Sequence, residues 1–452
     1  MSTTTFDVVK WICGASPRAE AADTFTSAHL SLVDFVGCSI AGSDHSAARA
    51  VTAISAISGE VPALGHSTTR LHAASAAYLH ALQAHAFELD DGDWDTWGHL
   101  GAPTIAAGLS AGWLSNATVG DVTDAVATAL VFGMSLGRQV NPGHYQHGFC
   151  TTGTIGALTA AAAAARLLRL DEVSTAHALD FAVAQATGVR QFALDGSASC
   201  LIIPANAARV GYEAAALAAA GLAGGLEALD GQLGFLRVIG GAAAADLRLP
   251  AYPEHRPSQI YYKPHSCCGN ALGPIRGFVE GWERLDHAPL RHILFELPRE
   301  VTRNVNHATP DSELERHLSL QLAVAMHLTR GAIAARDLID VAVTDELKQI
   351  MGIVQVEVLK TDNAHELRAD EMGFVSLIAA DGRKLRCPVT AVGPAMGESD
   401  IDEKFRSLVE SSIGERGSER LRSMLGDWSS PVREVLLAGR VPAQISSASA
   451  FH

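Results

Sequence analysis

The sequence predicts a mainly α-helical protein that contains a smaller α+β domain. In the first half of its 452 residues, one alanine-rich helical pattern follows another. From His292 onward the pattern is mixed, because segments that alternate apolar and polar residues lie between helical ones. Helical spacing returns after Gly393-Pro394. We therefore predict a large all-helical domain built from residues 1–264 and 394–452, into which an α+β domain of residues 265–393 is inserted.

The helices of the first half are predicted from apolar residues at helical spacing and from residues typical of helix ends. Asp121 and Ser174 are expected as N-caps, and Gly92 is expected to close a helix in the left-handed conformation. Pro103 stands where a helix-opening proline belongs. The predicted ranges are 24–40, 69–92, 103–114, 121–140, 153–168, 174–187 and 205–220.

The second half is predicted to combine strands with helices. Asp381-Gly382 lies between two alternating segments and indicates a β-hairpin. The predicted strands are 292–298, 354–361, 374–380 and 384–389, and the predicted helices are 311–330, 345–351, 400–425 and 431–437. The last residues, SSASAFH, are expected to be disordered.

The charge, the apolar runs and the cysteines of the sequence argue against several classes of function. The net charge of −15 and the absence of a Lys/Arg cluster argue against nucleic acid as a partner. The N-terminus lacks the features of a signal peptide, and the alanine-rich runs are too weakly apolar to predict a membrane span. Seven scattered cysteines fit a reducing compartment, so we expect a cytoplasmic protein that binds neither nucleic acid nor a membrane.

The stretch HAFELDDGDWDTWGHLGAP, residues 85–103, is the densest in chemistry-bearing side chains. Glu88, Asp90, Asp91 and His99 crowd a short loop with two tryptophans between two predicted helices. Loops on rigid scaffolds often carry function, so this stretch is a candidate site. The alternative is an acidic, solvated loop whose tryptophans cover a neighbouring helix.

A second dense stretch, IYYKPHSCCGNALGP, lies at residues 260–274 near the predicted domain boundary. Lys263 precedes a proline and so projects from a stiff segment, and His265 follows. Domain junctions favour ligand clefts, although Lys263 as a surface cation is the alternative. Cys267 and Cys268 are adjacent, which suits buried packing better than a zinc site.

No cofactor is predicted. The sequence contains no H-E-x-x-H motif, no facial-triad spacing and no cysteine-rich zinc pattern, so no metal site is expected. No G-x-G-x-x-G follows a predicted strand, which leaves nicotinamide and flavin cofactors unsupported.

Several segments, taken in order, resemble the MmgE/PrpD family. HAFELDD matches the family's H-A-x-[DE]-x-D-D motif, and His99 with the following Gly-Ala-Pro matches its next histidine. The remaining matches are TGTIGALTAAAAAARLL (152–168), GFLRVIGG (234–241), KPHSCCGN (263–270) and SLQLAVAMHL (319–328). The resemblance implies a large all-helical domain with a smaller α+β domain, usually assembled as a homodimer, and a small anionic polycarboxylate as substrate.

The sequence departs from the resemblance at three positions. Where the dehydrating and decarboxylating members of the family carry a histidine, a lysine and a tyrosine, this chain has Cys150, Cys200 and Leu322. Because Glu88, His99 and Lys263 are kept, the resemblance implies a retained carboxylate-binding cleft with changed chemistry. Among the family's activities this is most similar to iminodisuccinate epimerase. A lyase acting on a 2-methylcitrate-like or cis-aconitate-like acid is the main alternative, and a non-catalytic, ligand-sequestering protein is another.

An epimerase removes a proton from a carbon next to a carboxylate and returns one to the opposite face. Lys263 and His99 are candidates for stabilising the charge that develops on the carboxylate. His99 could be one acid/base group, with Tyr145 or His147 as the other. Cys150 and Cys200 are alternatives as a thiol/thiolate pair, unless they simply fill space.

The residues expected to bind the substrate complete the predicted site. They are Glu88, Asp90, Asp91 and His265, from the two dense stretches.

Overall fold

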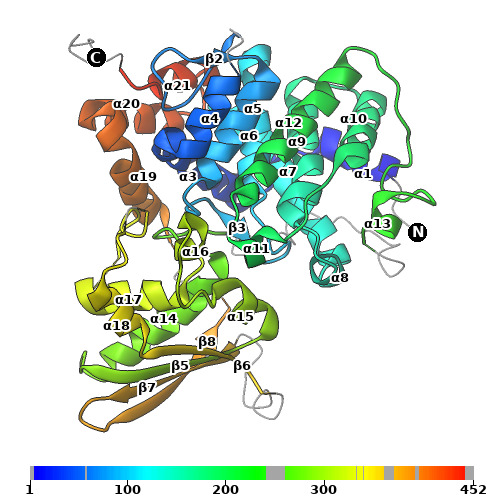
Figure 1. The fold of residues 1–452 in the computed structure, drawn as a ribbon. Helices are drawn as coiled ribbons and strands as arrows, with labels where there is room; N and C mark the ends of the chain where they lie inside the picture. The colour runs from blue at the N-terminus through cyan, green and yellow to red at the C-terminus, as the bar shows by residue number, and fades with distance from the viewer. Residues whose placement is uncertain are drawn as a thin grey trace.

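The computed structural model describes residues 5–55, 59–240, 260–331, 333–339, 341–360, 371–391 and 396–442. It is mainly helical with a smaller α+β part, which confirms this much of the predicted class (Figure 1). In Figure 1 the helical part lies above, and a sheet with its own helices lies below. The boundaries at 264 and 393 stay predictions. Gly393-Pro394 and the segment SSASAFH fall outside the described residues.

The larger part consists of helices from both ends of the chain. From the first half come α1 (Thr5–Gly14), α2 (Pro17–Glu20), α3 (Ala22–Ala41), η1 (Gly42–Asp44), α4 (Ser46–Ile54), α5 (Ala73–His85), α6 (Gly101–Ser115), α7 (Val119–Val140), α8 (Gly143–Gln146), α9 (Thr151–Leu167), α10 (Glu172–Gln185), α11 (Phe192–Asp195), α12 (Ser199–Ala219) and α13 (Phe235–Val238). The C-terminal segment adds α19 (Glu398–Ile413), α20 (Glu415–Gly426) and α21 (Val432–Ala438). Two short strand pairs complete this part, β1 (Val61–Pro62) with β2 (Arg70–Leu71), and β3 (Gly92–Asp93) with β4 (Ile260–Tyr261).

The centre of the helical part is α9, which contacts α6, α7, α10 and α12. Its alanines from Ala160 to Ala165 are all fully buried. The small side chains allow α12 to pass very close, since a Cβ atom at Gly211 would lie 2.4 Å from the Cβ of Ala160. At the other side α19 packs against α3, so the C-terminal segment shares one core with the N-terminal helices.

The smaller part is a four-stranded sheet with helices on one face. Its strands are β5 (Leu290–Leu297), β6 (Val354–Val358), β7 (Glu371–Ala379) and β8 (Lys384–Thr390), in the order β6-β5-β7-β8, with β5 and β6 parallel and the other pairs antiparallel. The helices are α14 (Gly269–Glu283), α15 (Arg299–Val305), α16 (Glu313–His317), α17 (Leu320–Arg330) and α18 (Asp345–Met351). The predicted hairpin at Asp381-Gly382 is confirmed, with Gly382 at φ +94°.

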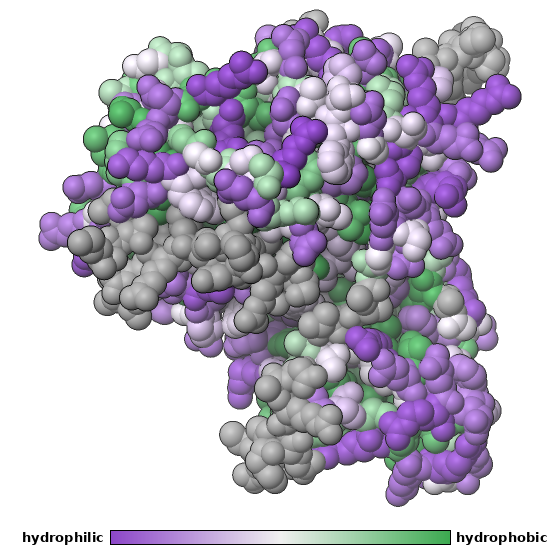
Figure 2. Space-filling model, turned by 180° about the vertical axis from the view of Figure 1, so that it is seen from behind, coloured by the Kyte–Doolittle hydropathy of each residue, from purple (hydrophilic) through white to green (hydrophobic). Residues whose placement is uncertain are grey.

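This sheet has a core of its own. Phe295, Val375 and Leu377 point from the strands toward Phe278 of α14, and all four side chains are fully buried. Seen from behind, the surface of the smaller part is largely hydrophilic (Figure 2). Along the strands, buried residues alternate with residues that are partly or fully exposed, which explains why period-2 alternation located these strands.

Several helix limits differ from the predictions, mostly by one turn. The N-caps are Thr118 and Asp171, not Asp121 and Ser174. In each pair the predicted residue is the third of the helix, and its backbone N–H donates to the true cap. The helix predicted from Ala205 begins at Ser199, with Pro204 in its second turn.

Two predicted helices are each divided in two. The range 311–330 is divided because the Ser319 hydroxyl accepts from the N–H of Leu322 and starts a new helix. The range 400–425 is interrupted at Gly414, whose φ of +75° is left-handed.

Two helical segments are long and apolar enough to span a membrane. One is α3 together with η1, and the other is α7. In both, 89% of the apolar window is buried inside the structure. Core helices of globular proteins share this composition, so these helices are weak evidence for a membrane span. The cytoplasmic location stays a prediction.

Candidate active site

The two dense stretches of the sequence meet in the strand pair β3–β4, where Gly92 lies opposite Tyr261. A Cβ atom at Gly92 would lie 2.3 Å from the Tyr261 hydroxyl oxygen, so this position has room only for glycine. The prediction that Gly92 closes a helix is therefore wrong. Helix α5 ends at His85, and Gly92 is needed for close packing.

The backbone between α5 and β3 is held from two sides. The Ser266 hydroxyl donates to the carbonyl of Phe87 (2.5 Å), and the Lys404 ammonium of α19 donates to the carbonyl of Leu89 (2.6 Å). Between these anchors Glu88 has a φ of +52°. The left-handed region costs a non-glycine residue about 1–2 kcal/mol, so the anchors hold a strained turn that presents the Glu88 side chain to a cavity.

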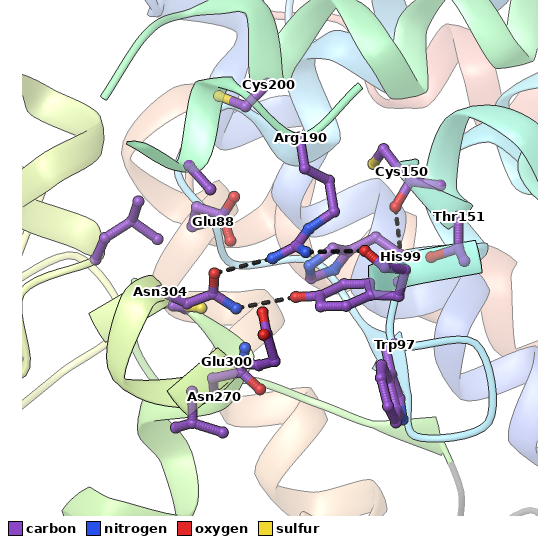
Figure 3. A pocket seen from close by; sticks show the side chains of 18 of the residues that line it. Glu88, Trp97, His99, Cys150, Thr151, Arg190, Cys200, Asn270, Glu300 and Asn304 are labelled. Carbon is purple, nitrogen blue, oxygen red and sulfur yellow. Dashed lines mark hydrogen bonds between the residues drawn. The ribbon is translucent and has the colours of Figure 1, made fainter. Parts of the chain in front are cut away.

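This cavity has a volume of about 400 Å³ and is lined by residues of both parts of the molecule (Figure 3). Its size is within the range of small-molecule sites. Aromatic and aliphatic side chains, among them Trp94, Trp97, Phe192, Ile203 and Tyr261, form much of its wall. The polar lining consists of His85, Glu88, His99, Tyr145, Gln146, Cys150, Thr151, Thr152, Arg190, Cys200, Asn270, Glu300 and Asn304.

At one side of the cavity, four side chains form what we call the carboxylate cluster: Lys263, Glu88, His85 and Asp90. The Lys263 ammonium lies 2.9 Å from Glu88 Oε2 and 3.9 Å from Asp90 Oδ1. The His85 ring lies between the carboxylates, with Nε2 3.2 Å from Glu88 Oε1 and Nδ1 3.0 Å from Asp90. Both ring nitrogens face carboxylate oxygens, so the ring is held as an imidazolium.

The charges of the carboxylate cluster balance, two positive against two negative. Burial by itself lowers the pKa of His85, but Asp90 and Glu88 outweigh burial and raise it to about 10. Burial likewise opposes the charged form of Lys263, yet Glu88 and Asp90 raise the pKa of the lysine above its ordinary value. The pKa values of both carboxyls are lowered, because the neighbouring cations outweigh burial.

His99 has a different environment beside this cluster. Its Nδ1 lies 2.7 Å from the backbone carbonyl of Asp91, which can only accept, so Nδ1 carries the proton. Nε2 is then the unprotonated nitrogen of a ring that lines the cavity. Burial, with Lys263 as the next cause, lowers the pKa of His99 to about 4. His99 is therefore a neutral imidazole with a fixed tautomer and a lone pair available for a proton.

Three further residues form what we call the tyrosine cluster: Tyr145, Arg190 and Asn304. Figure 3 labels Arg190 and Asn304 and draws the hydrogen bond between them as a dashed line. The Arg190 guanidinium lies over the Tyr145 ring, 3.3 Å from its centroid. Arg190 Nη2 donates to Asn304 Oδ1 (3.0 Å), and Asn304 Nδ2 donates to the Tyr145 hydroxyl (2.9 Å). Burial raises the pKa of Tyr145, while Arg190 and Asn304 oppose that rise. The phenol therefore keeps its proton near neutral pH.

Cys150 and Cys200 both line the cavity. Burial raises the pKa of each thiol, which keeps both protonated and makes them weak bases for a thiol/thiolate pair. Cys150 is the N-cap of α9 and Cys200 lies in the first turn of α12. This environment favours packing over proton transfer.

Other predicted site residues do not reach the cavity. Lys263 is fully buried behind Glu88, which differs from the expected direct contact with a substrate carboxylate. Asp90 lies behind His85 in the same way. His147 is exposed to solvent, with Nδ1 bonded to a carbonyl of its own helix, so the proposed pairing of His147 with His99 is not what the structure provides.

Asp91 and His265, both predicted to bind the substrate, also lie elsewhere. Asp91 is buried at the start of α6, where a Cβ atom at Gly101 would lie 2.0 Å from its carboxylate. Burial raises the pKa of Asp91 to about 8. His265 packs on His327, and burial lowers its pKa to about 3, so it is a neutral core residue.

Three residues of the site were not predicted from the sequence. His85 belongs to the H-A-F-E motif, and its distance of three residues from Glu88 could have suggested the contact. Arg190 lies in a loop before α11, and Asn304 lies in α15 of the α+β part. Neither stands in a motif, and only the packing of the two parts brings them to Tyr145.

A possible metal-ligand set does arise from tertiary contacts. Ligand atoms of His85, Asp90 and His99 all lie within 4.8 Å of one another. Among the described residues, however, both nitrogens of His85 already face carboxylates, and the Lys263 ammonium is 3.9 Å from Asp90. A divalent ion would have to displace a proton from His85 beside a fixed positive charge, which makes the site unfavourable for a metal.

Comparison with known families identifies the group to which this fold and site belong. Residues 7–248 match the model of the MmgE/PrpD N-terminal domain. The match covers more than half of the chain, so the protein belongs to the MmgE/PrpD family, as the resemblance of its motifs predicted. A search of curated proteins finds no match. The family includes dehydratases and epimerases, so membership indicates an enzyme without choosing between isomerase and lyase.

Proposed function

We propose that the protein is a cofactor-independent epimerase that inverts a carbon next to a carboxylate in a small polycarboxylate, with iminodisuccinate as the first substrate to test. One observation carries the proposal. A single cavity is lined by a neutral histidine with a fixed tautomer, His99, and by a protonated phenol, Tyr145. One group can accept a proton while the other donates one, which is what inversion of a carbon requires.

The proposed reaction begins with proton removal by His99 Nε2 from the carbon next to the carboxylate. The electron pair of the broken C–H bond moves onto the carboxylate. Tyr145 then delivers its hydroxyl proton to the other face of the carbon, and the reverse reaction uses the two groups in exchanged roles. The substrate balances, because one proton is taken and one is returned. The turnover leaves a proton on His99 and a phenolate at Tyr145, and exchange of protons with water restores both groups before the next turnover.

Arg190 is the residue best suited to bind the substrate carboxylate. Its guanidinium lines the cavity, and among the described residues it has hydrogen bonds but no ion-pair partner. The imidazolium of His85 is the second positive group on the wall. Fixed cations near the carboxylate stabilise the negative charge that builds up in the transition state. Lys263 contributes indirectly, since it holds Glu88 and the His85 ring in place.

The decisive experiment measures the uptake of deuterium from the solvent into the product. The purified protein is incubated in deuterated water with each stereoisomer of iminodisuccinate, and the product is analysed for configuration and isotope. An epimerase of the proposed type introduces solvent deuterium at the inverted carbon. Inversion without deuterium would contradict direct proton exchange with solvent.

The same assay tests the lyase alternative. Citrate-family and aconitate-family acids are supplied instead, and release of water or CO₂ is measured. Such release with no inversion of iminodisuccinate would replace the epimerase by a dehydratase or decarboxylase. Cys150→Ser and Cys200→Ser variants are included, because a large loss of inversion in either would make a thiol, and not Tyr145, the second acid/base group.

A further inference from the structure

Asn304 is the link between the α+β part and the acid/base tyrosine of the helical part. It lies in α15 and is 5% exposed, and its amide group bonds to Arg190 on one side and Tyr145 on the other. Arg190 is itself fixed to the Tyr145 segment, because its backbone N–H donates to the carbonyl of Gly148 (2.8 Å). Figure 3 draws both hydrogen bonds of Asn304 as dashed lines among the side chains that line the cavity.

The guanidinium of Arg190 decides which atom donates in each of these two hydrogen bonds. A guanidinium only donates, so the Asn304 oxygen faces Arg190 and the Asn304 –NH₂ faces the tyrosine. The Tyr145 oxygen therefore accepts from Asn304 at 2.9 Å. A phenol that accepts a hydrogen bond still has its own proton to donate, and no acceptor for it is found among the described residues. Because Tyr145 lines the cavity, this proton is available to a ligand there.

The same contact stabilises the ionised state of the tyrosine. A phenolate accepts a hydrogen bond from an amide N–H more strongly than a phenol does. Arg190 adds a positive charge over the ring. The other ionisable groups that face this position are Cys150 and Cys268, with Glu300 and His99 on the cavity wall.

We propose that Asn304 is a positioning residue for proton transfer: its amide makes Tyr145 an acceptor at one side, so that the phenol proton points to the substrate and the phenolate is stabilised after transfer. This inference rests on the proposed function. It also explains why a residue of the α+β part is needed at a site whose acid and base come from the helical part.

Asn304→Asp tests the orientation. The carboxylate has nearly the same shape and still accepts a hydrogen bond from Arg190. It also accepts a hydrogen bond from the Tyr145 hydroxyl, which turns the phenol proton away from the substrate, and it places a negative charge beside the phenol. We expect kcat to fall by about 10²–10³-fold, with a smaller change in KM. Asn304→Ala removes the donor to Tyr145 and the acceptor for Arg190 but adds no charge, and it should lower kcat by about tenfold. If Asn304 were merely a packing residue, the isosteric aspartate would be the milder change, so an Asp variant as active as the Ala variant overturns the proposal.

A matched control is Asn306→Asp, which adds the same charge next to α15. Asn306 bonds to Gln321 and to the carbonyl of Val356 and lies outside the cavity lining. This variant should keep normal turnover. Thermal unfolding of all variants verifies that each is folded.

A spectroscopic titration tests the inference without any substrate. Tyrosinate absorbance is followed against pH in the wild-type protein, in Asn304→Asp and in Tyr145→Phe, and the component lost in Tyr145→Phe is assigned to Tyr145. That component should move to higher pH in Asn304→Asp. An unchanged titration refutes the role of Asn304 even if the protein is an epimerase. A shifted titration in a protein that inverts no substrate supports the role and refutes the proposed function.

Discussion

The carboxylate cluster and the tyrosine cluster border one cavity, yet they handle charge in different ways. In the carboxylate cluster, Lys263 and His85 are matched by Glu88 and Asp90, and the four groups are almost entirely buried. In the tyrosine cluster, the positive charge of Arg190 has no ion-pair partner among the described residues, and the phenol proton has no acceptor there.

The difference indicates a division of labour. Matched, buried charges hold geometry, because removing any one leaves an uncompensated charge in a low dielectric. Unmatched groups at the cavity are free to interact with a substrate. His99 lies at the border of the two clusters, with 16% of its side chain exposed and its ring 4.9 Å from that of His85. Variants at both clusters test this division.

The first prediction concerns His99 as the base. In His99→Asn, the amide N–H can still donate to the carbonyl of Asp91, as Nδ1 does, but no basic nitrogen faces the cavity. We expect inversion and deuterium exchange to fall by about 10²–10⁴-fold with the fold unchanged. Retention of normal exchange would assign the base to another group.

The second prediction concerns Lys263, which is fully buried. Lys263→Met leaves the two carboxylates of Glu88 and Asp90 with His85 as the one cation of the carboxylate cluster, so a buried negative charge is uncompensated and the free energy of unfolding should fall by about 3–5 kcal/mol. The double variant Lys263→Met/Glu88→Gln removes both charges and should recover most of that loss in denaturant titrations. If the single variant is as stable as the wild type, Lys263 is not part of a matched cluster.

The third prediction concerns pH and the stability of the carboxylate cluster. The pKa of His85 is raised from 6.5 to about 10, so its contribution to stability is fully present below pH 6.5 and is lost as the pH rises through about 10. Over this window the unfolding free energy of the wild type should decline more steeply than that of His85→Gln, by about 1.4 kcal/mol per pH unit. Parallel slopes in the two proteins would show that His85 is not held as an imidazolium.

The fourth prediction separates two neighbours in the sequence GHYQHG. Tyr145 lines the cavity, whereas His147 is exposed and outside the lining. His147→Ala should change the free energy of unfolding by less than about 0.5 kcal/mol and keep turnover near normal, while Tyr145→Phe should abolish most turnover. Steady-state rates with the same substrate decide this, and equal losses in both variants would restore His147 as a candidate.

The last prediction is that removal of metal ions does not change turnover. Dialysis against a chelator should leave turnover unchanged, because a metal between His85, Asp90 and His99 would compete with the protons and the lysine of the carboxylate cluster. Recovery of lost activity by a divalent ion after dialysis would show that the carboxylate cluster is a metal site.

Local patterns located most of the elements. The alternation of buried and partly buried residues in β5 and the Asp381-Gly382 turn are properties of neighbouring residues, so the sequence determined them. The same holds for the alanine-rich helix α9, whose limits were predicted within two residues. Helix starts were less accurate, because an aspartate or serine at the third helical position resembles a cap.

The sequence by itself also determined the family and the two motif stretches that meet at the site. Composition and spacing could not determine which side chains face the cavity. Lys263 and His147 both stand in segments rich in functional residue types, yet one lies behind Glu88 and the other faces solvent. Tertiary structure decided this, because burial and partner charges set whether a polar group holds the fold or meets a ligand. It also brought Asn304 to Tyr145, a contact across 159 positions in the chain that no local pattern encodes.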